Sequence, residues 1–281
     1  MLISNKVNCV VVILFILAVQ GWMNLTFADS SVVIPKHDSE SILGYLSESN
    51  LPDGISLLPP PPSWDSIAFR VDEEEYRVTR KLRDTPRWTL AIQDANLTFP
   101  EVVGSFSCAL NAPITEQLTP RIYKLMQSTR IDIKNSINKV KDHYKRARPF
   151  SVKKEMSCTP YDEARLIGNG SYPSGHTATS WTWALILTEI APERANPILA
   201  RGYAFGYSRV ICGVHWWSDV NAGFFIASMV AARLHADPVF RGDLEIAKTE
   251  LAEVRAKGLK PTRDCQQEAA ALSFNSASVT E

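Results

Sequence analysis

The most constraining feature of this sequence is that its apolar residues recur at helical spacing from Trp64 onward, while no segment shows a convincing strand alternation. Pro149, Pro192 and Pro238 should end three of the helices, because proline cannot continue a helix and disfavours helical geometry at the residue before it. The spacing predicts helices over 66–83, 87–95, 99–110, 118–147 (broken near Ser128), 177–190, 195–208, 216–236 and 240–257. The expected fold is all-α.

The chain divides into a helical domain and three flanking segments. The domain is expected over 64–260, and with 45% apolar residues the chain can bury a substantial core. Residues 29–63 lack helical periodicity and end in four consecutive prolines, so they read as an extended arm. Residues 261–281 are polar and rich in small residues, which predicts a disordered tail.

The first 28 residues have the pattern of an export signal. Lys6 is the only charge before Asp29, and Val10–Val19 is an apolar run shorter than the roughly 20 residues that a membrane-spanning helix needs. Small residues at Thr26 and Ala28 predict that a signal peptide, residues 1–28, is cleaved after Ala28. An uncleaved membrane anchor is the alternative. No later segment is long and apolar enough to cross a bilayer, so no membrane contact is expected after cleavage.

The charges balance, with 30 basic and 30 acidic residues. There is no overall basic field of the kind that attracts nucleic acid, so any anion must be bound by locally clustered cations.

Cleavage of the signal would leave four cysteines, which permits two disulfides in an oxidising compartment. Cys158 and Cys212 lie near the motifs described below, so we expect them to pair with each other. That would leave Cys108 and Cys265, and four buried, reduced cysteines are the alternative.

A first motif lies at the end of the predicted helix 118–147. Lys141 and Arg148 are seven residues apart, which is two helical turns, so both should point the same way, with Pro149 stopping the helix. A charged helix face is more often simply solvated, and this motif alone is weak.

A second motif, Pro173-Ser174-Gly175-His176, opens an apolar helix. The first N–H groups of a helix lack internal partners and lie at the positive end of its dipole, which suits a phosphate. Gly175 would allow close approach of the backbone, Ser174 could donate its hydroxyl, and His176 would stand at the rim. The alternative is a serine-capped helix followed by a surface histidine.

A third motif runs from Ser208 to Asp219 and contains Arg209 and His215. His215 and Asp219 are four residues apart, so in a helix the carboxylate could bond one ring nitrogen and leave the other as a free lone pair. That arrangement is what a nucleophilic histidine requires, although a structural His–Asp capping pair is the alternative. Together the motifs supply cations, an anion-binding helix start and two histidines, the groups that phosphoryl transfer needs.

The three motifs together resemble the signature of the type 2 phosphatidic acid phosphatase and vanadate haloperoxidase superfamily. The signature reads Lys141-x6-Arg148-Pro149, Pro173-Ser174-Gly175-His176 and Ser208-Arg209-x5-His215-x3-Asp219. The denser likeness is to the class A bacterial nonspecific acid phosphatases, and it extends over roughly Leu58 to Leu251. Its other matches are Leu82–Trp88, Thr159-Pro160, Arg201-Gly-Tyr, Val210-Ile-Cys-Gly and His235-Ala-Asp-Pro.

This resemblance implies a single-domain helical bundle and a role for each signature residue. His215 would be the nucleophile that forms a phosphohistidine, Asp219 would orient it, and His176 would be the general acid. The phosphoryl oxygens would be held by Lys141, Arg148, Ser174, Gly175 and Arg209. The resemblance also implies a periplasmic homo-oligomer that hydrolyses small phosphate monoesters broadly and needs no metal or other cofactor.

Three other functions share parts of this signature. A vanadate-dependent haloperoxidase uses the same pocket, a phosphate-binding protein would need the cations but no oriented nucleophile, and a membrane lipid phosphatase would need several transmembrane helices. The match around Tyr203 and Cys212 favours the phosphatase. Because His176 must be protonated while His215 is neutral, and an ordinary histidine pKa is about 6.5, we expect a bell-shaped pH profile with an acidic optimum.

Overall fold

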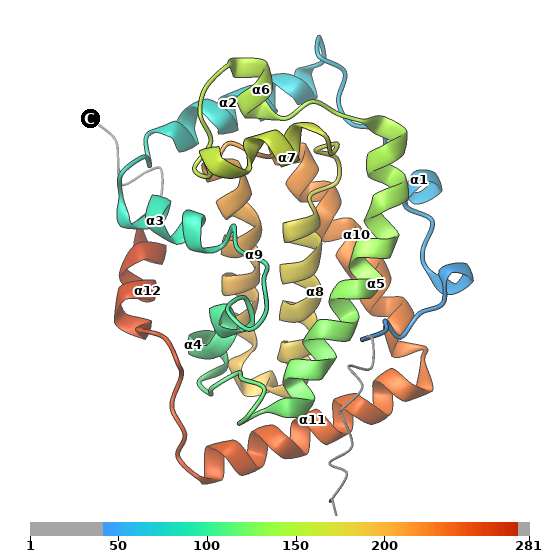
Figure 1. Ribbon diagram of the computed structural model, residues 1–281, viewed down its shortest axis with the longest axis vertical. Helices are drawn as coiled ribbons and strands as arrows, with labels where there is room; N and C mark the ends of the chain where they lie inside the picture. The colour runs from blue at the N-terminus through green and yellow to red at the C-terminus, as the bar shows by residue number, and fades with distance from the viewer. Residues whose placement is uncertain (1–41, 275–281) are drawn as a thin grey trace, which may run out of the picture. The chain divides into compact units, whose positions relative to one another are not determined.

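The computed structural model describes residues 42–274, which consist of helices and connecting loops without any strand (Figure 1). The all-α prediction is therefore confirmed. The α-helices are α1 (Gly54–Leu57), α2 (Ile67–Arg80), α3 (Pro86–Gln93), α4 (Ser107–Leu110), α5 (Pro120–Tyr144), α6 (Pro149–Lys153), α7 (Glu163–Ile167), α8 (Gly175–Ile190), α9 (Ala195–Ile211), α10 (Trp217–His235), α11 (Pro238–Ala256) and α12 (Cys265–Ser273). The 3₁₀ turns are η1 (Glu48–Asn50), η2 (Val103–Phe106), η3 (Pro160–Asp162) and η4 (Pro192–Arg194). The predicted signal peptide lies outside the described residues.

The core is built around α8, which packs against α5, α9 and α10 (Figure 1). A helix that is apolar on all sides is stable only when other elements cover it completely, and α8 has buried residues on opposite faces, such as Ala184 and Ile186. α11 packs across α5, α8 and α10, while α12 lies against α3 (Figure 1). The predicted phosphate-binding motif therefore lies at the start of the central, buried helix, whose position is fixed by its neighbours.

Glycines allow α8 to approach its two main neighbours very closely. A Cβ atom at Gly202 of α9 would lie 2.4 Å from the Cβ of Ala184, and one at Gly223 of α10 would lie 2.8 Å from the carbonyl oxygen of Ser174. Both distances are shorter than van der Waals contact, so these positions exclude any larger residue unless the helices separate.

The long helix α5 differs from its prediction at both a middle position and its end. It is unbroken at Ser128, which is buried together with its helical neighbours Leu125 and Thr129, so tertiary packing overrides the weak helix preference of serine. It ends at Tyr144, where Lys145 adopts a left-handed conformation with φ 43°. Arg148 therefore does not continue the helix of Lys141 but forms the N-cap of α6.

The region 99–110 was predicted as one helix, and that prediction is wrong for most of its length. It contains the turn η2 and the four-residue helix α4, which ends at Asn111 in a left-handed conformation. The buried residues Val102, Val103 and Phe106 fill the core from this loop, so their burial does not require a continuous helix.

The tail predicted to be disordered contains helix α12, so that expectation is wrong for Cys265–Ser273. Asp264 caps the helix by accepting from the backbone N–H groups of Gln266 and Gln267. A disulfide between Cys108 and Cys265 joins it to α4, and this long-range crosslink compensates for its lack of large apolar residues other than Leu272. The second disulfide joins Cys158 to Cys212, which confirms the expected pairing.

The described part of the N-terminal arm, residues 42–63, lies against α5 and the loop before α8. The buried carboxylate of Asp132 accepts from the backbone N–H groups of Tyr45 and Leu46, at 3.0 and 2.9 Å. The hydroxyl of Tyr172 donates to the carbonyl of Pro59. Among residues 42–274, no helix combines the length and apolar character needed to span a membrane.

The close packing at Gly223 can be tested with a matched pair of alanine substitutions. Gly223→Ala should destabilise the protein by about 1–3 kcal/mol, because the added methyl group overlaps the start of α8. Gly242→Ala is the control, since an exposed Cβ there meets nothing within 4 Å in α11 and better helix propensity should stabilise by about 0.5–1 kcal/mol. Urea denaturation monitored by circular dichroism measures both; equal stability of the two variants would contradict the packing argument.

Candidate active site

The predicted site residues converge where α8 and α10 begin and where α9 ends. The backbone N–H of Ser174, the N-cap of α8, donates to the carbonyl of Asp219 near the start of α10, at 2.9 Å. Its hydroxyl oxygen accepts from the N–H of Thr177, so the capping interpretation is correct, while the hydroxyl hydrogen can still be donated elsewhere. This backbone contact fixes the two helix starts against each other.

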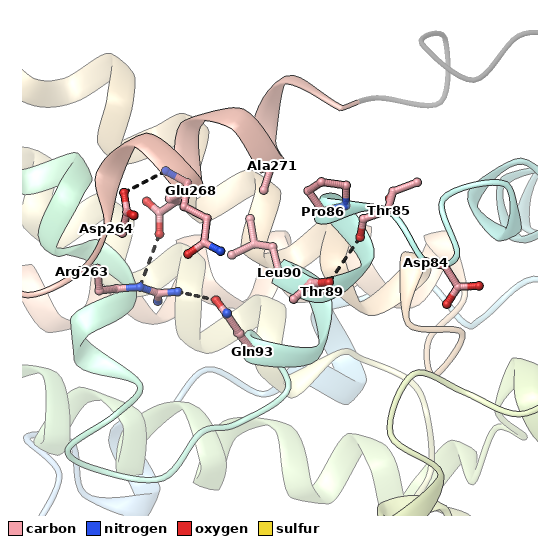
Figure 2. A pocket seen from close by; sticks show the side chains of 11 residues that line it. Asp84, Thr85, Pro86, Thr89, Leu90, Gln93, Arg263, Asp264, Glu268 and Ala271 are labelled. Carbon is pink, nitrogen blue, oxygen red and sulfur yellow. Dashed lines mark hydrogen bonds and ion pairs between the residues drawn. The ribbon is translucent and has the colours of Figure 1, made fainter.

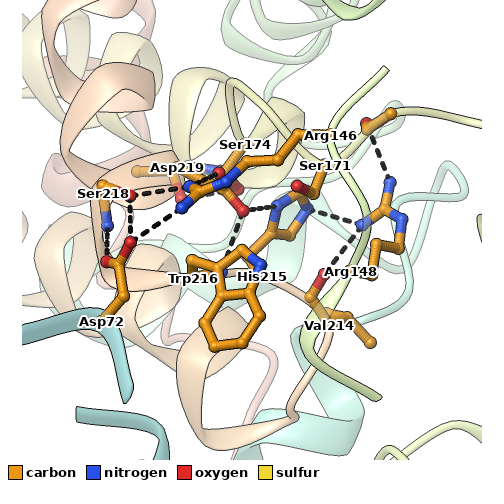
Figure 3. Close-up of polar contacts among 12 residues, drawn as sticks. Asp72, Arg146, Arg148, Ser171, Ser174, Val214, His215, Trp216, Ser218 and Asp219 are labelled. Atoms are coloured by element: carbon orange, nitrogen blue, oxygen red, sulfur yellow. Dashed lines mark hydrogen bonds and ion pairs between the residues drawn. The ribbon is translucent and has the colours of Figure 1, made fainter. Parts of the chain in front are cut away.

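His215 lies in the loop between α9 and α10, so it contacts Asp219 from this loop and not from one turn earlier in the same helix, as was predicted. Its side chain is only 3% exposed. Nε2 lies 3.1 Å from Nη1 of Arg148, which can only donate, so Nε2 accepts and the proton of the neutral ring is on Nδ1. Nδ1 faces Oδ2 of Asp219 at 3.4 Å, a contact longer than a well-formed hydrogen bond (Figure 3).

Asp219 is held by more partners than sequence reasoning identified. Oδ2 accepts from the backbone N–H of Trp216 at 2.8 Å, and Oδ1 accepts from Nη1 of Arg146 at 2.6 Å. Arg146 also binds Asp72 of α2 at 2.9 Å, and all three side chains are buried (Figure 3). Arg146 lies in the first motif but was not predicted as a site residue, because its neighbours in the sequence are typical of a solvent-exposed charged helix face.

Lys141 and Arg148 are buried without a direct carboxylate partner among the ion pairs of the described residues. Lys141 Nζ donates to the carbonyl of Gly170, which comes from the loop before α8. Arg148 donates to the carbonyl oxygens of Leu166 and Val214, each at 2.9 Å. Loop carbonyl groups, and not a shared helix as predicted, therefore direct these two cations to one place.

Arg209, near the end of α9, is 1% exposed, and its Nε and Nη1 atoms are buried without any hydrogen-bond partner in the described part of the chain. An unpartnered buried N–H group costs about 1–3 kcal/mol or more for a charged group. The guanidinium is therefore poised to donate to an anion.

Burial and the charge of Arg148 lower the proton affinity of the neighbouring cations. Burial, and next the charge of Arg148, lowers the pKa of Lys141 to about 7. Burial, and next Arg148, likewise lowers the pKa of Arg209 to about 9, and burial lowers that of Arg148 to about 10. A bound dianion would relieve both effects, so the site favours a ligand with two negative charges.

His176, in the first turn of α8, donates from Nε2 to the carbonyl of Ala95 at 3.0 Å. Burial, and next the positive charge of Arg209, holds the pKa of His176 well below its usual value. His215 and Arg148 act on it in the same direction, so the two histidines and these arginines share one electrostatic environment. The pKa of His215 is also held well below its usual value, by burial and next by Arg148, which keeps its ring neutral.

Gly175 also packs closely against α5. A Cβ atom there would lie 2.6 Å from the Cδ1 atom of Ile137, so a larger residue would require that side chain to move. Among residues 42–274, no cluster of three or more His, Cys, Asp or Glu side chains is arranged to hold a metal ion.

Comparisons with known proteins identify the family of this chain. The model of the PAP2 superfamily matches residues 130–242. A non-specific acid phosphatase of Providencia stuartii is 44% identical over 76% of this chain and 86% of its own. An acid phosphatase of Zymomonas mobilis is 39% identical over 74% and 79%, and a non-specific acid phosphatase of Salmonella typhi is 40% identical over 69% and 78%.

The chain therefore belongs to the PAP2 superfamily and, within it, to the class A bacterial nonspecific acid phosphatases. It is an enzyme, an acid phosphatase, with an all-α phosphatase fold.

The buried ion pairs of Arg146 should be essential for stability. Arg146→Met would leave the carboxylates of Asp72 and Asp219 without their buried cation, and should destabilise the fold by about 3–5 kcal/mol. Arg77→Met removes an exposed arginine paired with Glu74, and should leave the urea midpoint unchanged. An Arg146 variant as stable as the Arg77 variant would show that the buried pairs are replaceable.

Proposed function

We propose that the enzyme hydrolyses phosphate monoesters through a phosphohistidine on His215, without a metal ion. The observation that supports this best is the buried, neutral imidazole whose Nε2 lone pair faces Arg148 while Nδ1 faces Asp219. A dianionic phosphoryl group would attract the N–H groups of Arg148, which frees Nε2 for attack on phosphorus.

In the first step the Nε2–P bond forms and the ester P–O bond breaks, with its electron pair leaving on the alcohol oxygen. His176 donates a proton to that oxygen. Asp219 stabilises the positive charge that develops on His215, because its carboxylate faces Nδ1. In the second step a water molecule gives a proton to His176 and attacks phosphorus, which breaks the N–P bond and releases inorganic phosphate.

Charge neutralisation in this proposal comes from the protein. Lys141, Arg148 and Arg209 would contact the phosphoryl oxygens, with the hydroxyl of Ser174 and the first N–H groups of α8 as further donors. These cations take the role that Mg²⁺ has in many phosphoryl-transfer enzymes. Since they recognise only the phosphoryl group, we propose that many monoesters are accepted.

We also propose that the protein is exported, on the evidence of the signal-like sequence over 1–28. The two disulfides are consistent with an oxidising compartment such as the periplasm.

The nucleophile can be tested with p-nitrophenyl phosphate in excess EDTA at pH 5–6. We expect full activity of the wild type, and loss of at least about 10³-fold on His215→Ala, because no other group can form the intermediate. His143→Ala is the matched control, since His143 is exposed on α5 and should be dispensable. Acid quenching destroys phosphohistidine, so the labelled intermediate should be trapped under alkaline denaturing conditions. Inhibition by EDTA would contradict the metal-free mechanism, and peroxide-dependent halide oxidation after addition of vanadate would favour the haloperoxidase.

The pH dependence follows from the two histidines. Because its pKa is lowered, His215 stays neutral and nucleophilic in mildly acidic solution. Because the pKa of His176 is lowered, its protonated acid form is lost as pH rises. A bound phosphate dianion would raise this pKa again and so restore part of the acid form. We therefore expect kcat/KM, corrected for substrate ionisation, to reach its maximum below pH 6.5 and to fall on the alkaline side. A maximum near pH 9 would contradict the assignment of His176.

A further inference from the structure

We propose that Asp94, a buried carboxylate outside the signature motifs, is a positioning residue. It would keep the general acid His176 correctly placed relative to the phosphate-binding Arg209. This inference rests on the roles proposed above for these two side chains. Asp94 is the C-cap of α3 and directly precedes Ala95, whose carbonyl accepts the Nε2 proton of His176. The backbone at Asp94 therefore determines where that carbonyl lies.

The contact with Ala95 also determines which nitrogen of His176 can act. A carbonyl oxygen only accepts, so Nε2 keeps its hydrogen and Nδ1 is the nitrogen that gains and loses the catalytic proton. If the carbonyl shifted, the ring could turn or change tautomer, and Nδ1 would no longer face the leaving oxygen. General acid catalysis is sensitive to this, because misplacement by about 1 Å can cost about 100-fold in rate.

The side chain of Asp94 connects α3 to α9 on the side of Arg209. Oδ2 accepts from the hydroxyl of Ser208 at 2.6 Å, and Ser208 is the residue directly before Arg209. Arg87 of α3 donates to the same hydroxyl at 2.9 Å and to the carbonyl of Ala204 at 2.8 Å. One carboxylate thus joins the support of the general acid to the support of a phosphate ligand.

Arg201 of α9 fixes the carboxylate itself. Its Nη2 and Nη1 atoms bind the two oxygens of Asp94 at 2.5 and 3.2 Å, and its Nε donates to the carbonyl of Ser105 at 3.1 Å. Both side chains are almost completely buried, and a paired guanidinium and carboxylate hold one geometry better than a single bond does.

The helix α12 covers this pair from outside. Glu268 is only 7% exposed, and its carboxylate lies 3.5 Å from Nε of Arg201. The same carboxylate lies 3.7 Å from Nε of Arg263, and Arg263 in turn donates to Gln93 of α3 at 2.7 Å (Figure 2). A cavity of about 430 Å³ beside these residues is lined by both α3 and α12. The disulfide at Cys265 holds α12 in this position, so the C-terminal segment belongs to the same supporting network.

The test uses the dependence of rate on the leaving group. An alkyl phosphate needs protonation of its departing oxygen far more than p-nitrophenyl phosphate does, and kcat/KM reports the step in which that oxygen departs. Asp94→Asn should lower kcat/KM for glycerol 2-phosphate roughly 10- to 100-fold more than for p-nitrophenyl phosphate. A residue with only a structural role would lower both values equally.

Asp132→Asn is the matched control, since Asp132 is also a buried carboxylate but binds the backbone of the N-terminal arm. It should lower stability without changing the ratio of the two kcat/KM values. If Asp94→Asn does not fold, Ser208→Ala decides, because it removes the contact beside Arg209 and should change the ratio in the same direction.

The variant His176→Ala distinguishes an error in the positioning role of Asp94 from an error in the acid role of His176. It should change the ratio more than any other variant. If it does, and neither Asp94→Asn nor Ser208→Ala changes the ratio, the positioning role is wrong while the acid remains His176. If His176→Ala itself leaves the ratio unchanged, the proposed acid is wrong.

Discussion

The structure depends on burying three cations close together, in a site where no carboxylate of residues 42–274 pairs with them directly. Burial lowers the pKa of all three cations, and the charge of Arg148 lowers the pKa of Lys141 and Arg209 further. This unfavourable energy must be offset by the rest of the fold. Loop carbonyl groups hold Lys141 and Arg148, while Arg209 keeps unpartnered N–H groups. The result is a positively charged site, and a bound dianion would offset part of this energy.

Two buried arginine–carboxylate groups support this pocket from opposite parts of the chain. At the start of α10, Arg146 joins Asp72 to Asp219. At the end of α3, Arg201 joins Asp94 to α9. Each group supports one histidine by engaging one of its nitrogens, directly through Asp219 or through the neighbouring carbonyl of Ala95. In the proposed mechanism the other nitrogen of each ring carries out the reaction, so that one histidine is the nucleophile and the other is the acid.

Local sequence patterns predicted the helices well where a helix is bounded by strong signals. The ranges of α8 and α10 followed from their apolar runs, the serine cap at Ser174 and the limiting prolines. The pattern failed where tertiary contacts replace local preference. Val102, Val103 and Phe106 are buried without belonging to an α-helix, and α12 is stabilised by a disulfide and by Asp264 although Leu272 is its only large aliphatic residue. Neither the distant half of a disulfide nor the neighbour that buries a loop can be inferred from spacing.

The sequence by itself determined the fold class, the eight candidate site residues and the family, because helical periodicity and motif spacing are local properties. Only the tertiary structure decided how these residues meet: Lys141 and Arg148 converge from separate elements, and His215 meets Asp219 from a loop. It also identified Arg146 and Asp94, whose partners are more than 70 residues away in the chain. The role of each of these buried charges depends on partners that are distant in sequence, and folding alone brings those partners together.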